Sequence, residues 1–241
     1  MGYFKRFFKG WNVFEYVFLT AGIIIPVVIG EVCKSQLLEI FANVFMITVT
    51  LLFAKAKIEA YFLSFISLTL YVVVAYKALL YGEVIVYLAL ILPVTVYGLI
   101  NWMKNKFSDN RKGQVVKIIR TRWVELLVLF GSQAVLGVGY YFLLRALHTN
   151  LLLISTFSLA LSFVAVYLVA RRSEIALLGW VVEDFLVLAL WITVIAKGST
   201  DSAVMIVMAC MNIISDSYGV FMWRRLKKSQ SNPKSVTCDV V

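Results

Sequence analysis

The sequence NIISDSYGVFMWRR, residues 212–225, closes the last apolar run of the chain. An earlier apolar run ends in YGLINWMK, residues 97–104, which has the same Tyr-Gly-x-x-x-Trp spacing followed by a basic residue. A repeated ending of this kind indicates a repeated unit. The second copy also carries an amide and a carboxylate inside an apolar segment, where polar side chains usually face a cavity.

The composition around this stretch is that of a membrane protein. The chain has 241 residues, of which 62% are hydrophobic and 15% are charged. Its apolar runs reach about 20 residues, the length that a helix needs to cross roughly 30 Å of hydrocarbon. They do not show the alternation of barrel strands. We therefore predict an all-α polytopic membrane protein, a closed helical bundle that satisfies its backbone groups within each segment.

Eight membrane-spanning helices are predicted, at residues 12–33, 37–54, 58–80, 84–103, 123–147, 149–170, 174–196 and 202–223. With this division, 19 of the 23 Lys and Arg residues fall on one side of the membrane and 4 on the other. The basic side is expected to face the cytoplasm. Both termini are therefore predicted to be cytoplasmic.

The repeated ending gives these helices an order within a single membrane domain, residues 1–241. Lys55 and Arg171 are 116 residues apart, and they precede the matching predicted helices 58–80 and 174–196. The two Tyr-Gly endings are 121 residues apart. These two offsets along the sequence predict a parallel repeat about an axis along the membrane normal, as in some transporters. The predicted parts are an extra N-terminal helix (12–33), a first three-helix bundle (37–103), a linker helix (123–147), a second three-helix bundle (149–223) and a cytoplasmic tail (224–241). The basic connector 104–122 is expected to contact anionic lipid headgroups.

Amide and carboxylate side chains lie at one predicted depth in four helices. Each is about ten residues, or roughly 15 Å, from the cytoplasmic end of its helix. Two further patterns place polar residues on shared helix faces: Trp180 with Glu183 and Asp184, and Asn212 with Asp216. The residues at the common depth are Asn43, Gln133, Glu183, Asp184 and Asn212.

An indole and a carboxylate in one cavity favour a cationic, planar aromatic ligand, because the ring stacks on Trp while the charge is attracted to both groups. Such a cation would also pair with a buried carboxylate, since no Lys or Arg lies deep in a predicted helix. Which of Glu183 and Asp184 faces the cavity stays open, and Asn43 has an alternative role in holding helices together. Trp102, Trp191 and Trp223 are predicted to lie at the membrane interface. Glu15, Glu59 and Glu125 are predicted to be solvated or capping.

Several classes of function are excluded by the sequence. There is no motif of a nucleotide-binding loop, a serine hydrolase or a zinc protease, so no enzyme activity and no cofactor are expected. One histidine, His148, and three scattered cysteines indicate neither a metal site nor a disulfide framework. The net charge of +10 does not indicate nucleic-acid binding, because the basic residues lie in the loops between apolar runs.

The order of helices and the ending Tyr218 to Arg225 resemble the PnuC nicotinamide riboside transporters, whose fold is that of the SWEET sugar transporters. The resemblance covers about residues 12–228. It implies a bacterial plasma-membrane transporter that lets nicotinamide riboside equilibrate, with trapping by cytoplasmic phosphorylation, and a homotrimer. Related members handle thiamine or riboflavin. The predicted substrate-binding residues are Asn43, Gln133, Trp180, Glu183, Asp184, Asn212, Asp216 and Tyr218.

The predicted mechanism is alternating access by rocking of the two three-helix bundles around this site. Two alternatives stay open. One is a proton-coupled carrier that uses Glu183 or Asp184. The other is a receptor or scaffold in the membrane, in which the polar residues only hold the helices together.

Overall fold

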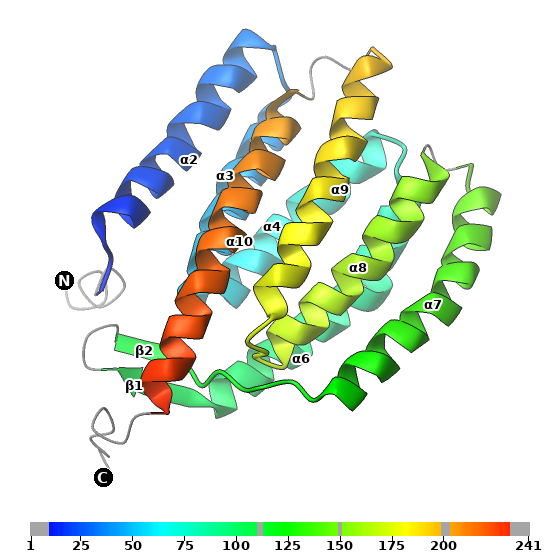
Figure 1. The fold of residues 1–241 in the computed structure, drawn as a ribbon. Coiled ribbons are helices and arrows are strands. Elements are labelled where there is room, and N and C mark those ends of the chain that lie inside the picture. Colours follow the sequence, from blue (N-terminus) through cyan, green and yellow to red (C-terminus); the bar gives the residue numbers. More distant parts are fainter. Residues whose placement is uncertain (1–9, 110–112, 149–150, 199–202, 232–241) are drawn as a thin grey trace.

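Eight helical segments of the computed structural model are long and apolar enough to cross a membrane, as predicted. The structure describes residues 10–109, 113–148, 151–198 and 203–231. The last helix extends past its predicted end at residue 223, and the predicted tail beyond residue 231 lies outside the described residues. The segments, drawn in Figure 1, are α2 (Val13–Val32), α3 (Leu37–Ala54), α4 (Glu59–Lys77), Tyr81–Lys104, α7 (Trp123–Ala146), α8 (Leu152–Ala170), α9 (Ala176–Ala196) and α10 (Ala203–Gln230).

The fourth segment is not the single regular helix that the sequence predicts. It consists of α5 (Tyr81–Val86), a π-helical turn η1 (Tyr87–Ile91) and α6 (Leu92–Lys104). Pro93 follows the turn and has no N–H to donate, and its ring opposes the carbonyl one turn earlier. The helix accommodates the proline by widening locally, a distortion that is frequent at functional sites.

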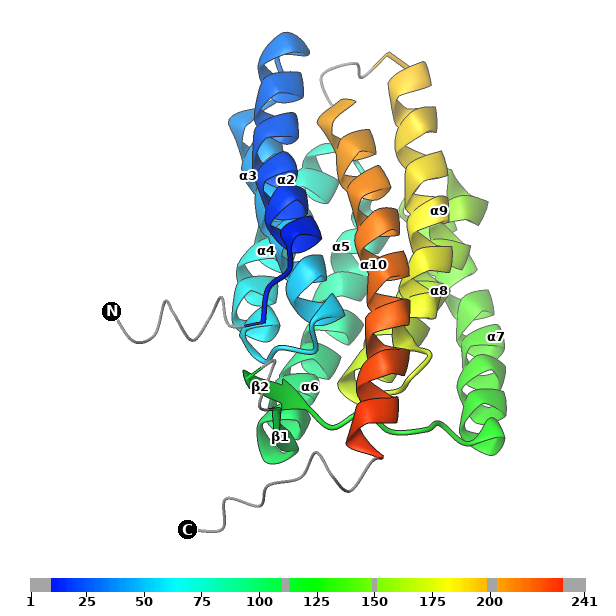
Figure 2. The ribbon, with the colours of Figure 1, turned by 60° about the vertical axis from the view of Figure 1, so that its left-hand side comes forward.

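The centre of the molecule is formed by α3, α4, α8, α9 and α10, with α2 at one edge and α7 at the other (Figures 1 and 2). α10 packs against both α9 and α3, and so joins the two halves of the chain. On α2, Gly22 lies against Ile47 and Gly30 lies against Ile40 of α3. Small residues at these positions let the helix backbones approach closely, as is common in membranes.

The basic connector between the halves is structured, which its composition did not indicate. It forms an antiparallel hairpin of β1 (Lys106–Asp109) and β2 (Gly113–Val116), seen at the lower end of the helices in Figure 1. Val115, Val116 and Ile118 are buried. Gln230 at the end of α10 accepts the Ile118 N–H at 2.9 Å and donates to Val116 O at 2.9 Å. The extension of α10 therefore serves to hold the connector.

The connector also bonds to both halves of the molecule. Val116 N–H donates to Ala56 O at 3.1 Å, after α3, and Ile119 N–H donates to Arg172 O at 2.9 Å, after α8. Both acceptors have positive φ, 54° at Ala56 and 62° at Arg172. The connector is thus a strap across one end of the bundle.

Three tryptophans predicted at the membrane interface are fully buried inside the protein, so they do not form the lipid-facing belt expected of them. Trp102, Trp191 and Trp223 have no exposed surface. Trp102 Nε1 donates to Val169 O at 2.8 Å, and Trp223 Nε1 donates to Phe53 O at 2.8 Å. Each bond runs from the last helix of one half to the end of the first helix of the other half. The indoles of Trp102 and Trp223 therefore tie the two halves together.

Candidate functional site

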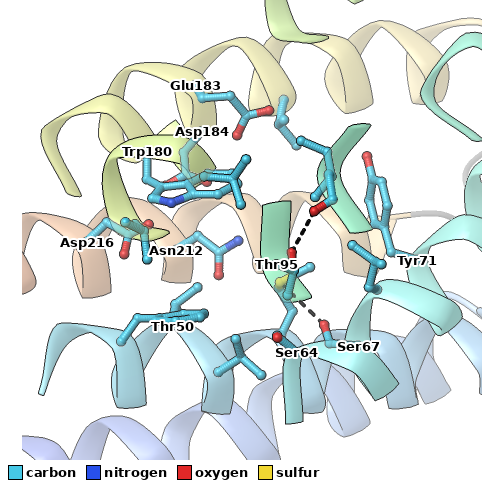
Figure 3. A pocket seen from close by; sticks show the side chains of 18 of the residues that line it. Thr50, Ser64, Ser67, Tyr71, Thr95, Trp180, Glu183, Asp184, Asn212 and Asp216 are labelled. Atoms are coloured by element: carbon cyan, nitrogen blue, oxygen red, sulfur yellow. Dashed lines mark hydrogen bonds between the residues drawn. The ribbon is translucent and has the colours of Figure 1, made fainter. Parts of the chain in front are cut away.

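A cavity of about 100 Å³ lies between the two halves of the chain. Residues of α3, α4, η1 and α6 line it on one side, and residues of α8, α9 and α10 line it on the other. Figure 3 shows Trp180, Glu183 and Asp184 on one wall and Thr50, Ser64 and Ser67 on the opposite wall. A space bounded by both halves can change its shape when the halves move relative to one another.

Five of the eight predicted binding residues line this cavity: Trp180, Glu183 and Asp184 of α9, and Asn212 and Asp216 of α10. The i, i+3, i+4 spacing on α9 and the i, i+4 spacing on α10 bring them to one face of each helix. Both Glu183 and Asp184 line the cavity, although they are adjacent in the sequence.

Glu183 is held in place by α8. Its Oε1 accepts hydrogen bonds from Ser158 Oγ at 3.0 Å and from Ser162 Oγ at 2.9 Å. All three side chains are buried. Two hydroxyl donors on one helix therefore fix a carboxylate of the next, and they explain how a buried Glu183 is accommodated.

Asp184 and Asn212 retain acceptor atoms for a ligand. Asp184 interacts with Asp216 and Asn212, which joins α9 to α10. Among the described residues, however, no hydrogen-bond partner is present for Asp184 Oδ2 or Asn212 Oδ1, and both atoms are buried. Buried acceptors without a partner are uncommon in native proteins. A bound cation or hydrogen-bond donor would satisfy them.

The opposite wall adds hydroxyl groups that the sequence did not single out. Ser64, Ser67 and Tyr71 follow one another on one face of α4, with Thr50 of α3 and Thr95 of α6 nearby (Figure 3). The i, i+3, i+7 pattern of polar residues on α4 is the signal that would have revealed this face. All five hydroxyls already donate within the protein, so their oxygens offer the cavity neutral acceptors opposite the acidic wall.

Glu83 was also missed, because it lies just before the predicted helix 84–103. It is buried and accepts a hydrogen bond from Tyr71 Oη at 2.6 Å. The Tyr71 ring lies 4.9 Å from the ring of Tyr87 in η1. Both tyrosines line the cavity, so Glu83 supports its wall from behind.

Asn43 and Gln133 are buried but do not line the cavity. Asn43 Nδ2 lies 3.5 Å from Glu39 O and 3.6 Å from Met205 Sδ of α10, which fits the alternative that it holds helices together. Gln133 lies on the peripheral helix α7, and neither side-chain polar atom has a partner among the described residues. A shared depth in the membrane therefore does not predict which side chains line the cavity.

Tyr218, the third predicted residue outside the cavity, belongs to a network at the N-terminus of α2. Its hydroxyl donates to Glu15 Oε1 at 2.9 Å and accepts from Asn12 Nδ2 at 2.9 Å. Glu15 also pairs with Lys55. Glu15 caps its helix, as predicted, through reciprocal bonds with Asn12. It is fully buried rather than solvated, and so ties α2 to the ends of both halves.

Comparison with known proteins places the chain in a family. The nicotinamide mononucleotide transporter family model matches residues 36–225. The chain is 28% identical to the nicotinamide riboside transporter PnuC of Neisseria mucosa over 94% of its own length and 87% of that protein. It is also similar to the crystal structure of the vitamin B3 transporter PnuC, with a TM-score of 0.85 and 26% identity, covering 95% of this chain and 98% of that one. The chain therefore belongs to the nicotinamide mononucleotide transporter family, and is of the PnuC type.

Proposed function

We propose that this protein is a membrane transporter for vitamin B3 that takes up nicotinamide riboside. The observation that carries the proposal is the chemistry of the cavity: three carboxyl groups and one indole line it, and none of its described lining residues is basic. An indole face and a carboxylate together bind a cationic aromatic ring. Nicotinamide riboside carries such a ring, a positively charged pyridinium.

The same chemistry favours the riboside over the mononucleotide. A mononucleotide adds a phosphate, and phosphate groups are bound by Arg, Lys or backbone N–H groups. Here the phosphate would face Glu183, Asp184 and Asp216 without a basic partner from the described lining. Burying an unpaired anion beside like charges is strongly unfavourable. We therefore infer a substrate without a phosphate.

The described side chains allow a specific binding mode. Trp180 stacks on the pyridinium ring, and the unpartnered Oδ2 of Asp184 pairs with the positive charge of that ring. Asn212 reads a hydrogen-bond donor of the substrate through Oδ1. We assign the ribose to the opposite wall, where the hydroxyl oxygens of Ser64 and Thr50 would accept hydrogen bonds from its hydroxyl groups. Orientation is thus set by a few polar groups in a largely apolar pocket.

Alternating access is the mechanism that we infer. The cavity of about 100 Å³ is smaller than the roughly 300–1,000 Å³ of typical ligand pockets, so the two halves must separate to admit substrate. Phe53, Tyr61, Trp102 and Trp223 pack edge to face or tilted at 5.0 to 5.8 Å beside it. This aromatic cluster closes the cavity at the end that carries the strap. Opening there requires the two indole bonds between the halves to break.

In the cell, we infer facilitated passage across the inner membrane of a bacterium, with both termini in the cytoplasm. Phosphorylation of the riboside inside the cell would then trap it. The homotrimer implied by the resemblance is part of the same proposal. The mass of the purified protein in detergent would test whether it is a trimer.

Uptake into proteoliposomes tests the site. Trp180→Ala and Asn212→Ala are expected to weaken nicotinamide riboside uptake about tenfold or more, because a desolvated cation–π contact or a hydrogen bond to a charged ligand contributes about 2 kcal/mol. Asn43→Ala is the matched amide control, since Asn43 lies outside the cavity. Equal uptake by the wild type and both cavity variants would refute the site.

Thiamine is the second candidate substrate, because it is also a cationic aromatic. Competition by thiamine, riboflavin and nicotinamide mononucleotide against labelled nicotinamide riboside separates these candidates. A proton-coupled carrier is distinguished by a pH gradient, which would drive accumulation above equilibrium. A receptor or scaffold would show no uptake at all, with or without a gradient.

A further inference from the structure

A groove separate from the cavity lies between α7, α8 and the connector. Its volume is about 840 Å³, within the roughly 300–1,000 Å³ of ligand pockets. None of the residues described as lining it also lines the cavity. α7 packs chiefly on α8, and only 17% of its span is buried, against 56% for α8. The groove therefore opens towards the lipid side of this helix pair.

One end of the groove is positively charged. Arg120, Arg122, Arg171 and Glu125 line it. Arg171 is neutralised, because its Nε donates to Glu125 Oε1 at 2.9 Å. Arg120 and Arg122 are exposed and form no salt bridge with any residue that the structure describes. Two guanidinium groups are thus available, and their planar fork of N–H donors suits phosphate.

The rest of the groove is apolar and runs along α7. Val124 and Val128 are 69% and 66% exposed, and Phe163 of α8 lines the opposite side. From Arg122 to Ser132, the far end of the lining on α7, the helix rises by roughly 15 Å. The charged end is therefore continuous with a wall that extends deep into the hydrocarbon region.

We propose that this groove binds an anionic phospholipid, with the phosphodiester between Arg120 and Arg122 and the start of an acyl chain along Val124 and Val128. A free phosphate would use the arginines but leave the apolar wall without a role. A zwitterionic lipid would use the wall but gain less from two unpaired positive charges. Basic pockets between membrane helices select anionic headgroups for this reason.

Native mass spectrometry of the full chain, released from phosphatidylcholine nanodiscs that contain phosphatidylglycerol, measures the retained lipid. The wild type is expected to retain phosphatidylglycerol, and the double variant Arg120→Gln/Arg122→Gln is expected to lose about tenfold or more of it. Arg224→Gln/Arg225→Gln is the matched control, because it removes two exposed arginines from the same end of the molecule. An equal loss in the control would show general surface attraction and overturn the proposal.

A second variant tests the apolar wall. Val128→Trp fills the groove while both arginines remain, and it is expected to lower phosphatidylglycerol retention without changing the helical content. Unchanged retention would overturn the proposal. So would binding of inorganic phosphate alone that displaces the lipid, which would indicate a site for a free anion. A change of oligomeric mass with unchanged lipid retention would also overturn it and assign the groove to contacts between copies of the chain.

Discussion

Glu15 is the charged side chain that the structure buries most completely among the described residues. It pairs with Lys55 after α3 and accepts from Tyr218 of α10. Lys55 Nζ also donates to Gly10 O at 3.0 Å and lies 5.0 Å from the ring centre of Trp11. A buried ion pair of this kind gives little net stability over apolar residues, but losing one partner is costly.

Glu15→Ala is therefore expected to lower the free energy of unfolding by about 3–5 kcal/mol. The physical reason is that Lys55 loses its carboxylate while it stays buried. The measurement is reversible unfolding in detergent micelles. Glu31→Ala is the control, since Glu31 is exposed at the other end of α2. The double variant Glu15→Ala/Lys55→Met should recover part of the loss, and similar values for Glu15→Ala and Glu31→Ala would contradict the prediction.

Single residues also show how far the site could be predicted. Trp180, Glu183 and Asp184 were found because helical spacing within one segment fixes which side chains share a face. Asn43 and Gln133 have a similar depth but lie outside the cavity. Depth follows from position along a helix, whereas the direction of a side chain depends on how neighbouring helices pack, which one sequence does not contain.

At the scale of elements, the two glycines of the repeated ending set how closely helices pack. A Cβ on Gly98 would lie 2.3 Å from the Tyr61 hydroxyl. A Cβ on Gly219 would lie 2.4 Å from Leu177 Cδ1 and 3.0 Å from Ala54 Cα. The second clash involves backbone, which cannot move aside as a side chain end can.

Gly219→Ala is expected to destabilise the protein by about 1–3 kcal/mol, as overpacking of a close helix contact does. Gly137→Ala on α7 is the matched control, because nothing lies within 4 Å of the added Cβ. The control should be neutral or slightly stabilising, since Ala is the better helix former. Thermal unfolding of the two variants side by side decides the matter, and equal melting temperatures would be inconsistent with close α10 packing.

The connector is the element that the sequence predicted least well. Its hairpin residues are few, and its partners Ala56, Arg172 and Gln230 are distant along the chain. Local composition indicated only a basic loop. In contrast, each membrane-spanning segment carries its own signal in its length and polarity, and the number and order of the eight segments were predicted correctly.

For the whole molecule, the two indole bonds join the halves at one end. Replacing both in Trp102→Phe/Trp223→Phe removes two hydrogen bonds of about 1 kcal/mol each and should favour states open at that end. A thiol reagent applied to that side should then react faster with Thr50→Cys in the cavity, in a chain whose own cysteines are replaced by serine. Trp191→Phe is the control, since its Nε1 has no partner among the described residues. Equal reaction rates in the two backgrounds would argue against the indole bonds as a closure.

The orientation in the membrane stays a prediction with a direct test. His148 and Lys228 are both exposed and lie at opposite ends of the molecule. In a chain whose own cysteines are replaced, His148→Cys should react with an impermeant thiol reagent in intact cells, whereas Lys228→Cys should react only after lysis. The reverse pattern would place the termini outside.

Matching contacts support the predicted repeat at the scale of the whole chain. Ala56 and Arg172, which are 116 residues apart, share a positive φ and each accept a bond from the connector. Trp102 and Trp223, which are 121 residues apart, each donate to the other half. These are the two offsets that the sequence patterns give.

The strap also bears on how the protein is made. Ile118 is synthesised 112 residues before Gln230, its hydrogen-bond partner. At about 5–20 residues per second, this leaves the strap without that partner for roughly 6–22 s on the ribosome. During this time the end of α10 is not yet present to pack near Val115, Val116 and Ile118, which are buried in the finished protein. Assembly of the transporter should therefore finish at its C-terminus, and ribosome stalling before residue 230 should leave a chain whose hairpin is open to proteases.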